Sequence, residues 1–137
     1  WTDAVGPAAA LATIDKYIKN NVQDHIINIG NLTKTIWSDA AEEFNLSINV
    51  SGLPTLGAFA FNHELPVHMN TNFVIEMLKH NILGFRQFKP SYAHTKDDLE
   101  NYKTAVSDVF KKLSNMTNEE LLASREAHSG FSRLVKE

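Results

Sequence analysis

The sequence predicts an α+β domain in which a small, mainly antiparallel sheet packs with helices. Its 137 residues are about the length of one domain. Apolar residues recur at three- and four-residue steps toward both ends of the chain and at two-residue steps near its middle, a pattern typical of helices around strands. No internal repeat or linker divides the chain. A sheet covered by helices is the economical arrangement for this order of elements.

The composition favours an ordinary globular protein and excludes several classes of partner. Hydrophobic residues make up 43% and charged residues 21% of the chain. The net charge of -3, with both signs interspersed, argues against a nucleic acid or an anionic membrane as partner. No apolar run reaches the ~20 residues that span a bilayer. The absence of cysteine excludes disulfides and thiolate metal sites, and we expect a cytoplasmic protein.

Residues 1–45 are predicted to form two helices. The first begins near Pro7, because proline is tolerated in a first helical turn. Its apolar stripe is Leu11, Ile14 and Ile18. Asn20 and Asn21 should break it. The second helix is expected from about Val22 to Phe44, with Trp37 in the core and a weak point of roughly 1 kcal/mol at Gly30.

Residues 46–115 are expected to hold the sheet and its helices. Alternating polar and apolar residues predict strands at Ser47–Ser51 and Thr55–Phe61, joined by a turn at Gly52–Pro54. A third strand is expected over Phe85–Lys89, where Pro90 would end the pairing. In the second strand Phe59 and Phe61 share one face, and small alanines share the other. We expect a helix to lie close to the small face.

Two further helices are predicted around the third strand. The first runs from about Thr71 to Leu83, is capped by Asn70 or Thr71, and is stopped by Gly84. Its expected buried face is Phe73, Val74, Met77 and Leu78. The second follows the cap at Thr95 and reaches about Leu113. Its stripe is Leu99, Tyr102, Val106, Val109, Phe110 and Leu113.

Residues 116–137 are expected to form a C-terminal helix. Thr117 and Glu120 have the spacing of a capping box. The apolar and mixed face that follows comprises Leu121, Leu122, Arg125, His128, Phe131 and Leu134.

Two histidine-containing stretches suggest chemistry that their spacing does not support. His63, Glu64 and His68 lack the i, i+4 spacing of a zinc-binding helix, and Pro66 interrupts them, so a polar loop is the better interpretation. His94 near Asp97 suggests a hydrolase triad, but no serine lies in a strand-turn-helix elbow. We expect His94 to be a loop residue that forms hydrogen bonds near the helix cap.

Among the charged residues, Arg86 and Lys89 in the predicted third strand are the candidates for a site. A lysine that forms a Schiff base needs a desolvated pocket to lower its pKa. Lys89 lies at a strand end and should be solvated. An unpaired guanidinium inside an apolar strand would be costly. Arg86 is therefore expected to pair with a carboxylate of the fold or to face a cleft and bind a substrate carboxylate. The residues alone indicate no self-sufficient active site.

Four segments of the chain, taken in order, match motifs of one known enzyme family. Trp1–Thr13 is similar to the segment WTE-x-x-GP-x-AALAT, and Gly57–Phe61 looks like the strand that opens a small-domain sheet. Glu76–Gly84 resembles the helix end EML-K-x-G-I-L-G, and Ala93–Leu99 resembles the helix start AHT-x-x-D-(L/I/V). These segments, and the whole of Ile82–Thr95, resemble the C-terminal domain of class-III aminotransferases that depend on pyridoxal phosphate (PLP), and especially the glutamate-1-semialdehyde 2,1-aminomutase branch.

The resemblance implies a fold-type-I enzyme, normally a homodimer, that transfers an amino group on an amino-acid-like substrate. In such enzymes a lysine of the large domain carries PLP, and an aspartate there pairs with the pyridine nitrogen. That domain precedes the stretch matched here, so we expect a piece of a longer polypeptide with no catalytic or cofactor-binding residue of its own. The chain alone should be inactive. Arg86 departs from the aminomutase pattern, which leaves aminomutase and aminotransferase activities both open.

A different class of function also fits the composition. The chain could be a free-standing, non-catalytic α+β interaction module without a cofactor. The two alternatives differ in exposed apolar surface, because a domain severed from a larger partner should show an apolar patch.

Overall fold

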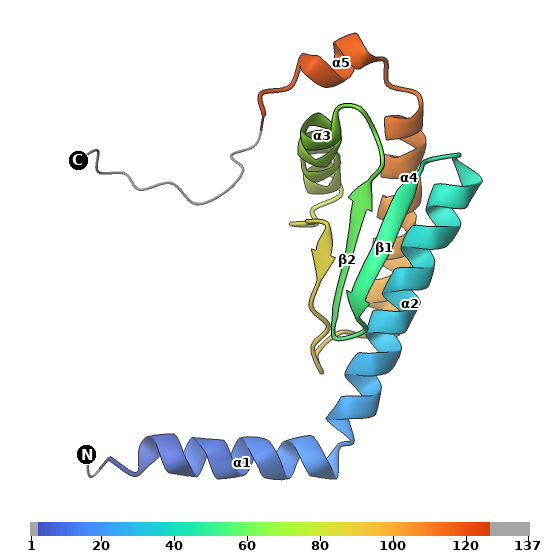
Figure 1. Cartoon of the computed structure of the whole chain (residues 1–137). Helices are drawn as coiled ribbons and strands as arrows, with labels where there is room; N and C mark the ends of the chain where they lie inside the picture. Colours follow the sequence, from blue (N-terminus) through green and yellow to red (C-terminus); the bar gives the residue numbers. More distant parts are fainter. Residues whose placement is uncertain (1–2, 127–137) are drawn as a thin grey trace, which may run out of the picture.

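The protein was analysed as a computed structural model, which describes residues 3–126. The described chain forms a three-stranded antiparallel sheet in the order β1-β2-β3, with five helices around it (Figure 1). The predicted α+β class is confirmed. None of the helices in this part of the chain is long and apolar enough to cross a membrane.

The first helix, α1 (Val5–Lys19), is exposed to solvent along its whole length. None of its residues is buried, and Leu11, Ile14 and Ile18 of the predicted stripe are 54–71% exposed. In Figure 1 α1 extends away from the sheet and the other helices. The predicted break is confirmed, because Asn21 has a left-handed backbone (φ 47°) between α1 and α2.

The second helix, α2 (Val22–Glu43), lies against the sheet and α4 (Lys96–Ser114). Trp37 is fully buried, as predicted. Gly30 is more than a weak point of the helix. A Cβ atom there would lie 1.8 Å from the carbonyl oxygen of Pro54, so only glycine allows the hairpin turn to come this close.

The hairpin of β1 (Ile48–Leu53) and β2 (Leu56–Phe61) has the register Ile48↔Phe61 to Leu53↔Leu56. Its turn lies at residues 54–55, slightly later than predicted. The third strand, β3 (Gln87–Phe88), pairs with β2 only at Gly57 and Ala58. The prediction of a strand over 85–89 was too long, because the backbone bends at Arg86 and leaves regular pairing on both sides of these two residues.

The helices cover the large-residue face of β2, so the expectation of a helix on the small face was wrong. Phe59 and Phe61 are buried, whereas Ala58 and Ala60 are half-exposed. The ring of Phe59 lies 5.0–5.7 Å from the rings of Trp37 on α2, Phe73 on α3 and Phe110 on α4. Large aromatic side chains bury far more apolar area than alanines do, and this area decides which face the helices cover.

The third helix, α3 (Pro66–Lys79), begins and ends earlier than the sequence suggests. Pro66 occupies its first turn, so neither Asn70 nor Thr71 is the cap. Asn81 ends it with a left-handed backbone (φ 60°), and Ile82 N–H donates to the Met77 carbonyl in a Schellman motif. Gly84 does not stop the helix; it packs against the Met77 side chain.

The face of α3 is rotated slightly from the predicted one. Phe73 and Met77 are buried, whereas Leu78 is 49% exposed. The predicted stripe of α4 is confirmed, because all six of its residues are buried. The predicted capping box of Thr117 and Glu120 is confirmed. The predicted cap at Thr95 is confirmed as well, and the structure shows that it forms a capping box with Asp98.

The last helix, α5 (Asn118–Leu122), is much shorter than predicted. Leu121 is buried, and the helix ends before Arg125. His128, Phe131 and Leu134 of the predicted face lie outside the described residues. Figure 1 shows α5 at the end of the domain opposite to α1.

Candidate functional site

A cleft of about 660 Å³ lies between the segment that connects α3 to β3 and the first turns of α4. Its lining includes half of the residues of Ile82–Thr95, one of the stretches that carry the sequence resemblance. From the connecting segment and β3 it is lined by His80, Asn81, Ile82, Leu83, Gly84, Phe85, Gln87 and Phe88, and from the turn and α4 by His94, Asp98, Leu99, Asn101, Tyr102, Thr104 and Ala105.

Tyr102 and Phe88 connect the wall of the cleft to the core. Their rings lie 5.5 Å apart. The hydroxyl of Tyr102 accepts a hydrogen bond from Trp37 Nε1 at 2.9 Å. Burial raises the pKa of Tyr102 to about 12, against a smaller lowering by the bond from Trp37. The phenol therefore stays neutral at physiological pH. It lines the cleft as a structural residue and does not serve as a proton donor in a reaction.

Asp98 places a negative charge at the rim of the cleft. The Thr95 hydroxyl and backbone N–H both donate to Asp98 Oδ2, at 2.7 Å each. These hydrogen bonds, the side-chain bond first, lower the pKa of Asp98. The carboxylate is thus occupied as a helix cap, which makes it a poor general base.

Arg86 does not lie where the sequence predicted. It is exposed at the bend before β3, so the expectation of a guanidinium inside an apolar strand was wrong. Its guanidinium lies over the ring of Phe85, 5.6 Å from the centroid, and forms no ion pair with a carboxylate of residues 3–126. Its carbonyl accepts a bond from Phe59 N–H at 2.9 Å. Phe85 and Gln87 line the cleft, but Arg86 between them does not, so its side chain does not face this cleft.

No lysine in the described chain has a desolvated environment. Lys89 is exposed, as expected. Lys79 and Lys112 are bound to the two oxygens of Glu76 at 2.7 and 2.8 Å. Lys34 is half-buried and donates to the Gly52 carbonyl. Between residues 3 and 126 there is also no group of three or more histidine, cysteine or acidic side chains that could hold a metal ion.

His94 forms hydrogen bonds near the helix cap, as predicted, and the structure gives it a second contact. Its Nδ1 accepts a bond from Ser91 N–H at 2.9 Å, and its carbonyl lies 3.1 Å from His25 Nε2. The contribution of His25 could not be found from the sequence, because 69 positions separate it from His94 and its helical spacing carries no signal of a partner.

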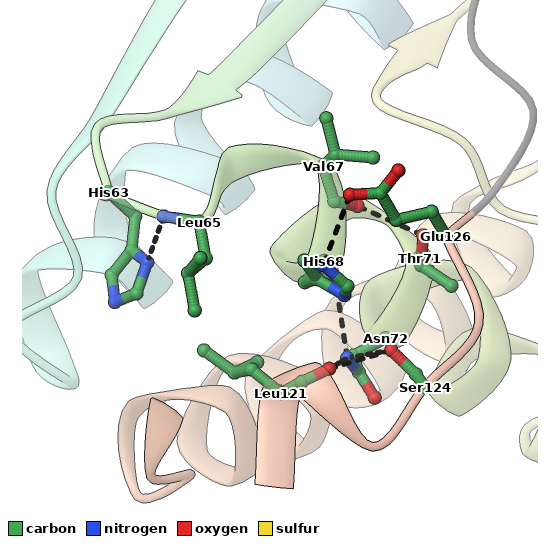
Figure 2. Close-up of polar contacts among 9 residues, drawn as sticks. All are labelled: His63, Leu65, Val67, His68, Thr71, Asn72, Leu121, Ser124 and Glu126. Carbon is green, nitrogen blue, oxygen red and sulfur yellow. Dashed lines mark hydrogen bonds and ion pairs between the residues drawn. The ribbon is translucent and has the colours of Figure 1, made fainter. Parts of the chain in front are cut away.

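A second polar cluster joins α3 to the segment after α5 (Figure 2). His68 Nε2 lies 3.2 Å from Glu126 Oε1, and the amide of Asn72 donates to Ser124 Oγ at 2.9 Å. The prediction of a polar loop was wrong for His68, which lies on α3 and is buried. These contacts join residues 124–126 to α3, while the buried Nδ1 of His68 has no hydrogen-bond partner among the described residues.

No family model matches the sequence, and no curated protein matches it. Among solved structures, the fold is similar to part of the FumI protein of Sphingopyxis sp. MTA144, determined in its PLP internal aldimine form. The TM-score is 0.74 at 20% identity, over 82% of this chain and 28% of that chain. This likeness shows that the chain has the fold of a portion of a PLP-dependent protein, and that it spans less than a third of that protein's length.

Proposed function

We propose that this chain is the smaller domain of a larger, PLP-dependent enzyme that transfers an amino group on an amino-acid-like substrate. The bare apolar face of α1 carries the proposal. Isolated helices of about 15 residues are marginal in water, so an α1 with no buried residue needs a surface to cover it. The likeness to a 28% portion of a PLP-bound protein suggests what that surface is, namely the rest of such an enzyme.

In this proposal the chain supplies binding surface and the remaining polypeptide supplies the chemistry. Bound PLP would act as the electron sink of the reaction. A lysine that carries it needs a desolvated pocket, whereas the described lysines are exposed or held by other groups. The isolated chain is therefore inactive. The parent enzyme is a cytoplasmic homodimer of the aminotransferase or glutamate-1-semialdehyde aminomutase type.

Arg86 is the residue of this chain that binds the substrate carboxylate in the proposed enzyme. A guanidinium binds a carboxylate through two parallel hydrogen bonds, provided that no internal carboxylate occupies it. Arg86 meets this condition within residues 3–126, and the Phe85 ring below it limits its orientations. Its side chain is exposed and does not line the cleft of this chain, which suits a group that reaches toward a neighbouring domain.

The test is to isolate the natural polypeptide with an antibody against this chain. We expect a protein much larger than 15.4 kDa that carries the yellow colour of bound PLP and transfers amino groups, while the 137-residue chain shows neither property. A natural protein of 15.4 kDa that stays colourless after addition of PLP would overturn the proposal. So would amino-group transfer by the chain alone.

A free-standing interaction module is the second candidate, and the closed aromatic core favours it. Phe59, Phe73 and Phe110 are buried without help from any other polypeptide. The two candidates differ at α1. A severed domain should bind hydrophobic dyes or associate through α1, whereas a module should stay monomeric and bind no dye.

A further inference from the structure

The strand β1 is an edge of the sheet, and part of its backbone points away from β2. Asn62 N–H donates to the Ser47 carbonyl at 2.8 Å at the open end of the hairpin ladder. Hydrogen-bonded pairs alternate along an antiparallel ladder, so the register directs the N–H and carbonyl groups of Ile48, Val50 and Gly52 outward. Those of Ile48 and Val50 form no hydrogen bond among the described residues.

Residues 48–50 of this edge lack the usual protection against pairing with another chain. Edge strands are commonly protected by charged residues, proline or a bulge. The strand Ile48–Leu53 contains no charged residue and no proline, and its register with β2 is continuous. Lys34 protects only the far end, where its Nζ donates to the Gly52 carbonyl at 2.9 Å. The backbone groups at residues 48–50 are therefore free to accept a further strand.

A groove of about 350 Å³ runs along this part of β1 and has α2 as its other wall. Figure 1 shows β1 beside α2. The groove is lined by Ser38, Ala41 and Glu42 from α2 and by Leu46, Ser47, Ile48 and Val50 from the start of the hairpin. A strand added to a sheet lies about 4.8 Å from its neighbour, so its side chains on the helix-covered face would lie over α2. Ser38 and Ala41 are small and leave room there for an apolar side chain.

The charge of the groove selects a basic segment. Glu42 lines the groove, is exposed and forms no ion pair with residues 3–126. Asp39, three positions earlier on α2, is also exposed and has no ion pair in the same range. In an extended peptide, side chains two positions apart lie on the same face. A lysine or arginine two residues from the apolar side chain therefore suits Glu42.

The position of the groove favours a separate polypeptide as its occupant. Residues 38–42 lie roughly 24–30 Å along the axis of α2 from its first residue. Figure 1 shows α1, the helix that the rest of the proposed enzyme would cover, at the opposite end of α2. A second copy of β1 fits the groove poorly, because Ile48–Leu53 contains no basic residue that could pair with Glu42.

We propose that the groove between β1 and α2 binds an extended segment of a separate protein, which joins the sheet as a fourth strand with an apolar and a basic side chain at alternate positions over α2. The added strand runs antiparallel to β1, as the other strands of the sheet do to their neighbours. The groove and its charges belong to this chain alone, so the test requires neither PLP nor amino-group transfer.

The test is to add the capped peptide Thr-Val-Thr-Lys-Thr to the isotopically labelled 137-residue chain and to follow the amide signals by NMR. We expect saturable shifts and slower hydrogen exchange at Ile48 and Val50. In an antiparallel pairing the N–H groups of the peptide valine and lysine face β1. Methylation of these two nitrogens should weaken binding by about tenfold or more, because two hydrogen bonds are lost, whereas methylation of the threonine nitrogens should have little effect.

Three substitutions on α2 provide matched controls. A peptide with glutamate in place of lysine should bind the natural chain about fivefold more weakly, and Glu42→Lys should reverse this preference. Ser38→Trp fills the groove and should abolish binding. Thr35→Trp places the same ring on α2 at an exposed position that does not line the groove, and should leave binding unchanged. Unchanged signals of the aromatic core show that each variant is folded.

Several outcomes would overturn the proposal. They are the absence of shifts at β1 with millimolar peptide, equal effects of methylation at both sets of nitrogens, equal affinities for the lysine and glutamate peptides, and undiminished binding by Ser38→Trp. Shifts of the same signals with chain concentration alone would assign the edge to a second copy instead. Arg133 and Lys136 lie outside the described residues, and a tenfold gain in peptide affinity when both are replaced by glutamine would assign the groove to this chain's own C-terminal residues.

Discussion

Helices α1 and α4 each have an apolar stripe, but only the stripe of α4 is buried. They contain 15 and 19 residues, and each has an apolar stripe at helical spacing. In α4 seven residues are buried, whereas in α1 none is. An apolar stripe therefore predicts that one face of a helix is buried. It does not show whether the surface that buries this face belongs to the same chain.

The largest effect should come from truncating matched residues of the two helices. Phe110→Ala on α4 removes a fully buried ring from the aromatic cluster and should cost about 3 to 5 kcal/mol of unfolding free energy. Ile14→Ala on α1 removes a side chain that is 54% exposed and should change it by no more than about 0.5 kcal/mol. Urea unfolding of both variants measures the contrast. Equal losses would mean that α1 is already covered within this chain.

Alkaline pH should destabilise the folded chain through Tyr102, one of the buried residues of α4. The folded pKa of about 12 is above the ordinary value of about 10, so the stabilisation is complete below pH 10 and is lost as the pH rises through 12. The shift corresponds to about 2 to 3 kcal/mol. Urea unfolding between pH 9 and pH 12 should show this slope in the natural chain and a shallower one in Tyr102→Phe. Identical slopes would contradict the burial of the phenol.

Two glycine substitutions should change the unfolding free energy in opposite directions. Gly30→Ala on α2 would place a Cβ against the Pro54 carbonyl and should destabilise the chain by about 1 to 3 kcal/mol. Gly6→Ala on α1 meets no atom within 4 Å and should stabilise it by up to about 1 kcal/mol through helix propensity. Thermal unfolding compares the two variants. A stabilised Gly30→Ala would show that the hairpin turn does not rest on α2.

Acid should weaken the ion pair between Glu76 on α3 and Lys112 on α4. Among the described residues, α1 forms no ion pair of this kind. Burial alone would raise the pKa of Glu76, but the hydrogen bonds from Lys112 and Lys79 outweigh it, and the pKa is lowered. The stabilisation is therefore present above the unfolded value of about 4.5 and is lost as the pH falls through the folded value. We expect an effect of about 1 kcal/mol between pH 6 and pH 3. Glu76→Gln should unfold with less dependence on pH over that range.

The smallest effect on stability is expected at Arg86. Arg86→Gln removes an exposed side chain that has no ion pair with residues 3–126 and should change the unfolding free energy by no more than about 0.5 kcal/mol. In the proposed whole enzyme the same change should raise KM for carboxylate substrates by about tenfold or more, because a charge-assisted bond is lost. A substrate that lacks the carboxylate serves as the control. Equal losses for both substrates would remove Arg86 from the proposed site.

The local features of the chain were predictable because their causes are local. The capping boxes at Thr95 and Thr117 involve residues three positions apart, and the stripe of α4 follows from helical spacing. The break at Asn21 also follows from residues within one turn. At the end of α3 the local sequence predicts Gly84 as the stop, whereas Asn81 adopts the left-handed backbone and ends the helix earlier.

Other features depended on contacts between distant residues. The covered face of β2, the exposure of Arg86 and the bond between His25 and His94 arise where α2, β3 and α4 meet, and residues far apart in sequence carry no mark of that meeting. The sequence by itself determined the helices, most of their ends and the α+β class, because backbone hydrogen bonding and apolar periodicity act over a few residues. Only the tertiary structure decided which apolar faces are buried, where the cleft lies and that α1 is left bare.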